Sequence, residues 1–169
     1  ILQYAIQGKL AEQREEDGTA EELYKQIQAE KEKLIREGKI KKSNPLPEIT
    51  EDEIPFDIPE NWKWVRLEQV CEYIQRGKSP KYSDVKKYPV VAQKCNQWSG
   101  FSLEKAKFID PKTLGSYTED RILKDGDLMW NSTGLGTLGR VAIYEVDKNP
   151  YELAVADSHV TVIRPLKQY

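Results

Sequence analysis

The sequence predicts an α+β protein, with a strand-rich body and short helices that follow a helical arm and a proline-rich linker. Three observations predict this class. Residues 20–35 carry apolar side chains at helical spacing within a charged segment. Four prolines follow between residues 45 and 59, where they disfavour a helix. After residue 60, short runs of β-branched and aromatic residues recur between turn residues, as in strands.

Size and composition suit one domain with an accessory segment. The chain has 169 residues, of which 32% are charged and 38% are hydrophobic. No apolar run approaches the roughly 20 residues of a membrane span, and no targeting segment is visible at the start, so we expect a cytoplasmic protein without membrane contact. Cys71 and Cys95 are then expected to be free buried thiols. With only His159 beside them, they lack the four ligands of a structural zinc site.

Charge is distributed unevenly along the chain. Residues 1–60 hold 15 acidic and 9 basic residues, whereas residues 61–144 hold 14 basic and 9 acidic residues. An acidic arm before a basic body can mark a part that binds a polyanion. Ordinary variation in surface charge explains the same pattern almost equally well, so both interpretations stay open.

The arm is expected to span residues 1–42. Residues 1–10 resemble the end of a helix, with Gly8 near its terminus. Thr19 and Glu22 form a capping-box pattern that begins a second helix, and Gly38 ends it. One face of this helix is apolar and is expected to pack on a neighbouring helix; it comprises Ala20, Leu23, Tyr24, Ile27, Leu34 and Ile35.

The linker is predicted at residues 43–60 and the body at residues 61–169. Alternating apolar residues in Asn61–Leu67 predict a short half-buried strand, and Leu67–Ile74 predicts one or two helical turns. Further strands are predicted within residues 88–93, 101–109, 127–131, 140–145 and 160–163, with a loop at 77–83 and helical or turn structure at 110–120.

Several motifs suggest catalysis or cofactor binding but lack the required context. Gly134–Gly139 matches G-x-G-x-x-G, yet Val141–Tyr144 alternates like a strand where a dinucleotide fold needs a helix. We therefore favour a hairpin or irregular loop. Asn149-Pro150-Tyr151 is interpreted as a turn, and the Asp-x-Lys triplets beginning at Asp84 and Asp110 as solvated surface.

His159 lies beside Asp157 and Ser158. A catalytic triad needs these groups to meet a nucleophile in space, and successive residues of a strand point to opposite faces. A structural or hydrogen-bonding histidine is therefore the favoured interpretation.

The remaining polar groups of the body suit nucleic acid. Lysines neutralise phosphates, amides pair with adenine edges, arginine pairs with guanine, and hydroxyls among glycines approach phosphates closely. For any single residue, an ordinary polar loop is the alternative. The candidate DNA-binding residues are Lys78, Lys81, Tyr82, Lys86, Gln93, Lys94, Asn96, Gln97, Trp98, Asn131, Ser132, Thr133, Thr137 and Arg140.

Taken together, these stretches resemble the specificity subunit of type I restriction–modification enzymes. Ile1–Leu10 is similar to the end of a family helix, and Glu21–Lys42 to the helix that follows. Ile54–Leu67 resembles the entry to a target recognition domain and is the most specific part. Weaker matches to the domain's core follow at Gly77–Pro80, Asp125–Leu128, Gly139–Ile143, Ser158–Val160 and Arg164-Pro165.

The resemblance implies a division of labour. The specificity subunit binds double-stranded DNA, modification subunits methylate adenine with S-adenosylmethionine, and restriction subunits supply ATP-driven, magnesium-dependent cleavage. This chain would bind no cofactor or metal and would not be an enzyme. It would hold one recognition domain, incomplete at its C-terminal end. The alternatives are a stand-alone DNA methyltransferase or nuclease fragment, and a protein-interaction scaffold.

Overall fold

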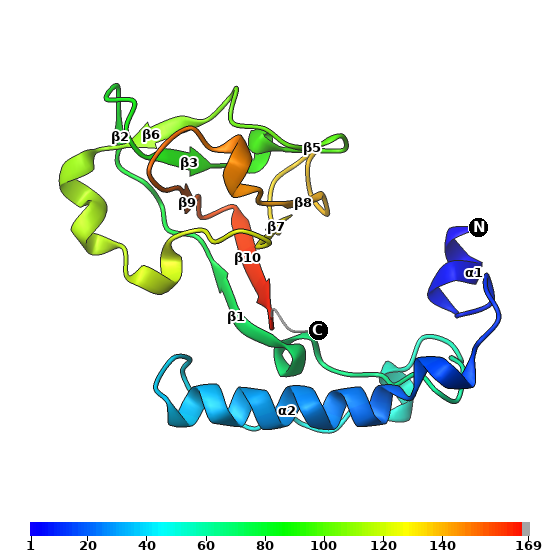
Figure 1. Cartoon of the computed structure of the whole chain (residues 1–169). Coiled ribbons are helices and arrows are strands. Elements are labelled where there is room, and N and C mark those ends of the chain that lie inside the picture. The colour runs from blue at the N-terminus through cyan, green and yellow to red at the C-terminus, as the bar shows by residue number, and fades with distance from the viewer. Residues whose placement is uncertain (167–169) are drawn as a thin grey trace. The chain divides into compact units, whose positions relative to one another are not determined.

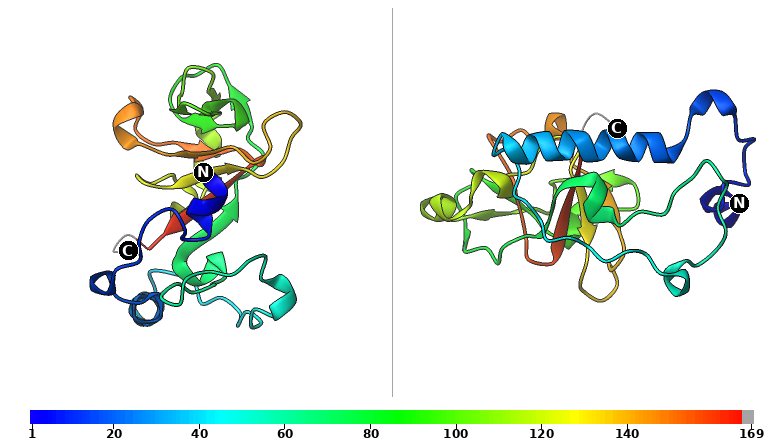
Figure 2. Two further views of the ribbon diagram at one scale, coloured as in Figure 1. Left: turned by 90° about the vertical axis from the view of Figure 1, so that its right-hand side faces the viewer. Right: turned by 90° about the horizontal axis from the view of Figure 1, so that it is seen from below.

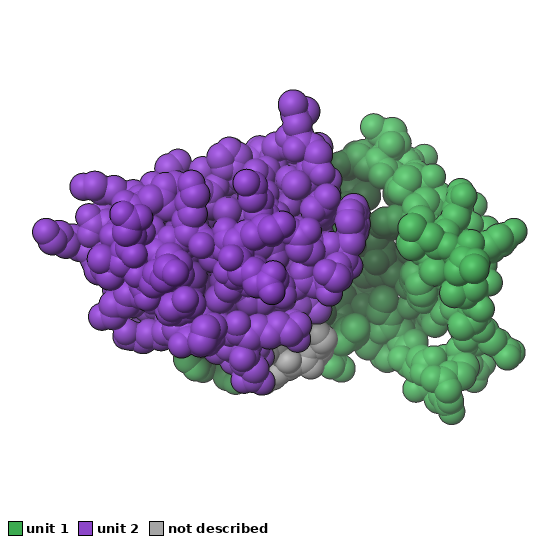
Figure 3. All heavy atoms as spheres, turned by 90° about the horizontal axis from the view of Figure 1, so that it is seen from above, with its two compact units in different colours: residues 1–72, 166–169 green, residues 73–165 purple. Residues whose placement is uncertain are grey.

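The computed structural model describes residues 1–166, so the last three residues of the body expected at 61–169 lie outside the described part. Helices and strands both occur, which confirms the α+β class (Figure 1). The chain forms two compact units: one contains residues 1–72 and Leu166, and the other contains residues 73–165 (Figure 3). This division follows contacts in space, and the expected limits at 42 and 60 remain predictions.

The first unit contains the helices. α1 (Leu2–Ile6) and the 3-10 helix η1 (Glu15–Asp17) precede α2 (Ala20–Arg36), the one long helix among the described residues (Figure 2). Thr19 caps α2, because its hydroxyl accepts the Glu22 backbone N–H at 3.3 Å. Gly38, at φ 71°, ends the helix, and the Lys39 N–H donates back to Leu34 O at 2.9 Å. The Thr19 half of the predicted capping box and the Gly38 terminator are thus confirmed, whereas the return bond from the Glu22 carboxylate to the Thr19 N–H is not found within residues 1–166.

α2 packs against the 3-10 helix η3 (Leu67–Val70) within the first unit. Ile27 is buried, and the Gln28 amide donates to Gln69 O at 2.9 Å. Lys31 is 9% exposed and donates through Nζ to Glu68 O. Burial lowers the pKa of Lys31. Of the six apolar residues of this face only Ile27 is buried, and Leu23 is 45% exposed. The helix therefore packs on a 3-10 turn of the same unit through Ile27, Gln28 and Lys31, which the sequence did not indicate.

The proline-rich segment has no strand and only one short 3-10 helix, η2 (Glu51–Glu53). Arg66 organises it: its guanidinium donates to Pro47 O at 2.8 Å and to both carboxylate oxygens of Glu53 at 3.0 and 2.9 Å. The ion pair with Arg66, together with the Thr50 N–H, lowers the pKa of Glu53 to about 2.

Near residue 70 one predicted element is wrong and another is confirmed only in part. Asn61–Leu67 is irregular: the Trp62 N–H closes a turn onto Pro59 O, and no strand pairs with the segment. Leu67–Ile74 is helical only in η3, because strand β1 (Cys71–Arg76) begins inside it. Alternation predicts a strand only where a partner exists, and short apolar runs do not distinguish helix from strand.

The second unit contains two four-stranded sheets and a two-stranded ribbon. The first sheet has the order β1-β10-β7-β8. Its strands besides β1 are β10 (Val160–Pro165), β7 (Leu128–Asn131) and β8 (Val141–Ile143). β7 is antiparallel to both of its neighbours. The second has the order β2-β6-β3-β9, formed by Tyr82–Ser83, Lys107–Ile109, Pro89–Val91 and Val155–Ala156. The ribbon pairs β4 (Asn96–Gln97) with β5 (Gly100–Phe101).

Short 3-10 helices connect these strands: η4 (Gln93–Cys95), η5 (Pro111–Ser116), η6 (Glu119–Arg121) and η7 (Val146–Lys148). The helical or turn structure expected at 110–120 is therefore confirmed. Asn149 accepts the Tyr151 N–H at 3.0 Å, which confirms a turn at Asn149–Tyr151.

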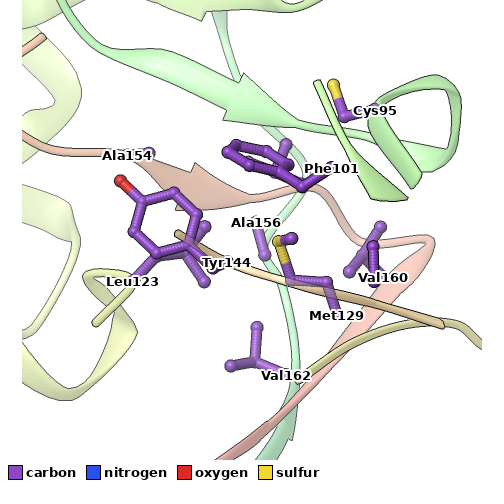
Figure 4. Close-up of a cluster of buried hydrophobic side chains, with 11 residues drawn as sticks. Cys95, Phe101, Leu123, Met129, Tyr144, Ala154, Ala156, Val160 and Val162 are labelled. Carbon is purple, nitrogen blue, oxygen red and sulfur yellow. The ribbon is translucent and has the colours of Figure 1, made fainter. Parts of the chain in front are cut away.

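The core of the second unit lies where the strands converge. Met129, Tyr144, Val160 and Phe101 pack together from β7, the segment after β8, β10 and the ribbon (Figure 4). A second cluster around Val90 and Ile109 lines the other sheet. Cys71 and Cys95 are buried and free, as expected, and lie in different units.

One buried ion pair crosses the first sheet. Arg164 on β10 donates to both carboxylate oxygens of Asp127 at 2.7 Å, and Asp127 is fully buried. Asp127 also accepts the Lys124 N–H at 2.8 Å, which fixes the turn before β7. The pair therefore fastens the Asp125-Gly126 turn to β10. Within residues 1–166 no helix is long and apolar enough to cross a membrane.

Candidate nucleic-acid interface

Three connections meet at one end of the first sheet. β7 ends at Asn131, directly opposite Val160 at the start of β10. The Gly77 N–H, just after β1, donates to Val160 O at 2.9 Å, and the Ser132 N–H donates to His159 O at 3.2 Å. We call this end the loop rim; it comprises residues 76–82, 93–101, 131–140 and 157–159. The β7–β8 loop extends past its strands (Figure 2).

A buried amide network supports the loop rim. The Asn131 side chain donates to Gln93 O at 3.1 Å and to Thr137 O at 3.2 Å, and accepts from Asn96 Nδ2 at 2.8 Å. Asn96 Nδ2 also donates to Met129 O at 2.9 Å. Asn96 and Asn131 are 0% exposed. In this structure they hold the loops in place, which differs from the base-contacting role expected from their residue type.

Glycine at position 134 lets the β7–β8 loop pack closely on η4, whereas Gly136 and Gly139 have open space around them and positive φ angles. Gly134 has φ 104°, and a Cβ on it would lie 1.8 Å from Gln93 Nε2. The Gln93 amide in turn donates to Thr133 O. The G-x-G-x-x-G match therefore lies in a hairpin between antiparallel strands, as predicted, and no helix follows it.

Trp98 and the half-buried Arg140 lie at the edge of this cluster. Trp98, between β4 and β5, is 82% exposed, and the Arg140 guanidinium carbon lies 5.5 Å from the centroid of its ring. The Arg140 guanidinium makes two long hydrogen bonds, at 3.4 Å from Nη1 to Gln97 Oε1 and 3.3 Å from Nη2 to Gly136 O. The guanidinium is thus held over an aromatic face with its Nη donors only weakly occupied, while its Nε is buried.

Four buried polar atoms of the loop rim have no hydrogen-bond partner among the described residues: Asn96 Oδ1, Thr133 Oγ1, Thr137 Oγ1 and Arg140 Nε. Buried polar groups usually carry a partner, so an unpaired set marks a place where water or a ligand completes the bonding. Ser132 differs, because its hydroxyl accepts from Thr161 Oγ1 at 2.7 Å.

The predicted lysines differ in what surrounds their ammonium groups. Lys94 is exposed on η4 beside the amide network. Lys78 lies after β1, where its ammonium donates to Ser116 Oγ at 2.8 Å and lies 5.1 Å from the centre of the Tyr117 ring. Lys81 lies 4.0 Å from Asp110, and Lys86 is exposed between β2 and β3. No described contact joins Lys81 or Lys86 to the Trp98–Arg140 cluster.

Asp157 connects Tyr82 to His159 at the loop rim. The Tyr82 hydroxyl donates to Asp157 Oδ2 at 3.0 Å, and His159 Nδ1 lies 2.6 Å from Asp157 Oδ1. Burial and this carboxylate raise the pKa of Tyr82 to about 12. The expected hydrogen-bonding histidine is confirmed. The strand argument does not apply here, because Asp157 and His159 lie in a tight turn that the Val160 N–H closes onto Asp157 O.

The Ser158 hydroxyl accepts from Ser79 Oγ at 3.2 Å, and the structure shows no bond from it to His159. Arg76 was missed by the sequence reasoning. It donates twice to Ser158 O, at 2.9 and 2.6 Å, and so fastens this turn to β1. Arg76 is the last residue of strand β1, but the sequence pattern of Leu67–Ile74 predicts helical turns there and so gives no sign of this strand end.

The sequence of the body matches a known family. Residues 59–169 match the family model described as the type I restriction modification DNA specificity domain. The chain belongs to this family. The matched residues include both the loop rim and the core that supports it, so the contacts described above belong to the specificity domain.

Similar proteins carry the same description. The chain is 50% identical over 72 residues to the specificity subunit of the type I restriction enzyme EcoAI of Escherichia coli, a match of 43% of this chain and 12% of that protein. It is 45% identical over 80 residues to the EcoEI specificity subunit of Escherichia coli, covering 47% of this chain and 14% of the relative. The chain thus matches about an eighth of the length of each curated relative.

A solved structure is also similar. The crystal structure of the HsdS subunit from Thermoanaerobacter tengcongensis aligns with 88% of this specificity-domain chain and 33% of its own, at 18% sequence identity and a TM-score of 0.48.

Proposed function

We propose that this chain recognises a double-stranded DNA sequence as part of the specificity subunit of a type I restriction–modification complex. The observation that carries the proposal is the Trp98–Arg140 pair, presented on two supported hairpin loops of a chain that belongs to the specificity-domain family. A two-stranded ribbon fits the major groove, where each base pair presents a distinct pattern of donors and acceptors.

We assign each loop-rim residue a role in DNA binding according to how exposed its side chain is. The weakly occupied Nη donors of Arg140 would pair with guanine O6 and N7, and the half-buried Gln97 lies beside them. Trp98 supplies a flat apolar face next to these donors. Lys94 and Lys78 are placed to contact phosphates and set the register. Asn96, Asn131 and Gln93 would act indirectly, by fixing the loops.

We assign no catalytic role to this chain. S-adenosylmethionine, ATP and magnesium would belong to partner subunits that methylate adenine and cleave DNA. In support, two polar side chains of the loop rim already have hydrogen-bond partners within the chain. The Asp157 carboxylate contacts Tyr82 and His159, and the Asn131 amide donates to Gln93 O and Thr137 O. We expect the chain to act in the cytoplasm.

The helical arm is proposed as the docking surface for modification subunits. α1 carries exposed apolar side chains: Leu2 is 76% exposed, Tyr4 60% and Ile6 47%. Such a surface fits a protein partner better than DNA. This observation also supports a scaffold role as the second candidate function.

Selection from a pool of randomised duplexes tests the proposal. The assembled complex is expected to enrich one motif, and Arg140→Ala should relax the choice at a single guanine, with a loss of about 1–3 kcal/mol at that position. Val146→Ala is the matched control, because Val146 is an exposed residue of η7, outside the loop rim. Enrichment of no motif would contradict DNA recognition. Tight binding of S-adenosylmethionine by this chain alone, measured by calorimetry, would favour a methyltransferase.

A further inference from the structure

Leu135 is the most exposed large apolar residue of the loop rim. Its relative exposure is 104%, and Leu138 in the same β7–β8 loop is 63% exposed. We infer that Leu135 contacts the C5-methyl group of a thymine in the DNA target and so specifies an A·T pair. This inference rests on the proposed function and extends it to a residue type that makes no hydrogen bonds.

The loop holds Leu135 in a defined position. Gly134, its neighbour, packs against the Gln93 side chain, and the Asn131 amide bonds to Thr137 O on the other side of the loop. The Gly139 N–H donates to Asn131 O at 3.0 Å and closes the hairpin. A side chain carried on such a supported loop loses little conformational freedom on binding. Its full exposure in the free chain therefore fits a contact made only in a complex.

The surroundings of Leu135 fit DNA as the occupant. Residues 93–103 and 128–144 contain two charged side chains, Lys94 and Arg140, and no aspartate or glutamate. Gly136, next to Leu135, bonds through its carbonyl to the same guanidinium that lies over Trp98. Leu135 is thus in the same loop as a cation that lies over an aromatic ring, and the two segments that carry this pair contain no carboxylate, so charge complementarity favours a polyanion.

The chemistry of the groove identifies the contact. Phosphates, sugars and most base edges present polar atoms, which a leucine side chain cannot satisfy. The one apolar group that a base pair offers in the major groove is the thymine C5-methyl. Because Arg140 lies in the same loop, the thymine read by Leu135 should lie close to the base pair read by Arg140.

The test replaces each thymine of the selected target with deoxyuridine, which lacks the methyl group. With the assembled complex, one deoxyuridine is expected to weaken binding about fourfold, the value of one buried methyl. Leu135→Ala should weaken binding about ten- to a hundredfold on the normal target and should lose sensitivity to that deoxyuridine. Val146→Ala should behave like the unchanged protein at every position.

Five outcomes separate the possibilities. Loss of the deoxyuridine effect in Leu135→Ala supports the inference. Unchanged affinity of Leu135→Ala overturns it. A deoxyuridine effect that persists in Leu135→Ala also overturns it, as does weakened assembly with the modification subunit at unchanged DNA affinity. If the unchanged complex selects no motif at all, the proposed function itself fails, before Leu135 is tested. Urea unfolding of Leu135→Ala should match that of the unchanged protein, because Leu135 makes no buried contact.

Discussion

Gly77 allows two strands to meet at the loop rim. A Cβ at this position would lie 2.3 Å from the carbonyl oxygens of both Ala156 and Asp157. These are backbone atoms, so they cannot rotate away as a flexible side chain can. The absence of a side chain at Gly77 thus lets its N–H reach Val160 O.

Gly77→Ala is expected to lower the free energy of unfolding by about 2–4 kcal/mol, because β1 must move away from the β9–β10 turn. Urea denaturation followed by circular dichroism measures the loss. Gly115→Ala is the control: its Cβ would meet nothing within 4 Å, and its φ is not positive. It should be neutral or stabilising by up to about 1 kcal/mol. Equal effects of both changes would contradict the close approach at Gly77.

The two thiols report on the packing of each unit. Burial raises the pKa of Cys71 to about 11 and also raises the pKa of Cys95. At pH 8 only about one Cys71 thiol in a thousand is then ionised, and the thiolate is the reactive form. Because folding raises these pKa values, deprotonation above about pH 9 favours the unfolded chain.

Alkylation with iodoacetamide at pH 8 should therefore be slow for both cysteines in the native protein. It should become fast in urea, and mass spectrometry of the two peptides measures each rate. Rapid modification of Cys95 in native conditions would contradict the buried core of the second unit, and rapid modification of Cys71 would contradict the packing of the first.

At the scale of elements, the β7–β8 hairpin depends on Asn131. Its side chain makes three hydrogen bonds, to Gln93, Thr137 and Asn96. Asn131→Ala would leave buried polar groups unpaired, at a cost of about 2–3 kcal/mol. It should also abolish sequence selection, although Asn131 is fully buried.

Urea unfolding and duplex selection together test this prediction. Ser99→Ala, an exposed neighbour of Trp98, is the control and should change the stability little. Normal stability and an unchanged selected motif in Asn131→Ala would contradict the supporting role.

Sequence reasoning predicts the elements whose signals are local. α2 is predicted by Thr19 and Gly38, and the β7–β8 hairpin by its glycines and flanking alternation. It fails where pairing decides the outcome. Asn61–Leu67 alternates but has no partner, and Cys71–Arg76 is a strand only because β10 lies beside it.

The same distinction applies to the candidate site. Residue type predicts that Arg140 and Trp98 suit DNA, but not that they stack on one another. Asn96 and Asn131 have the same chemistry as base-reading amides, and only the structure shows that they are buried. Leu135 was missed because a leucine between glycines gives no local sign of exposure. Burial and long-range contacts are properties of the fold that a single sequence pattern does not contain.

At the scale of the whole molecule, charge follows the two units. Residues 1–72 hold 17 acidic and 11 basic residues, and residues 73–165 hold 14 basic and 11 acidic residues. The excess in the second unit is small, so phosphate attraction alone would give weak binding. Under the proposed function, discrimination would then come from the loop rim, which carries Arg140, Trp98 and Leu135.

The most direct measurement maps DNA methylation in cells that carry the intact subunit, and then in cells where Gln93–Trp98 is exchanged for the corresponding segment of a relative with another target. A changed methylation motif, at unchanged level of assembled complex, is the result that our account predicts. An unchanged motif after the exchange would contradict the claim that this loop rim reads DNA.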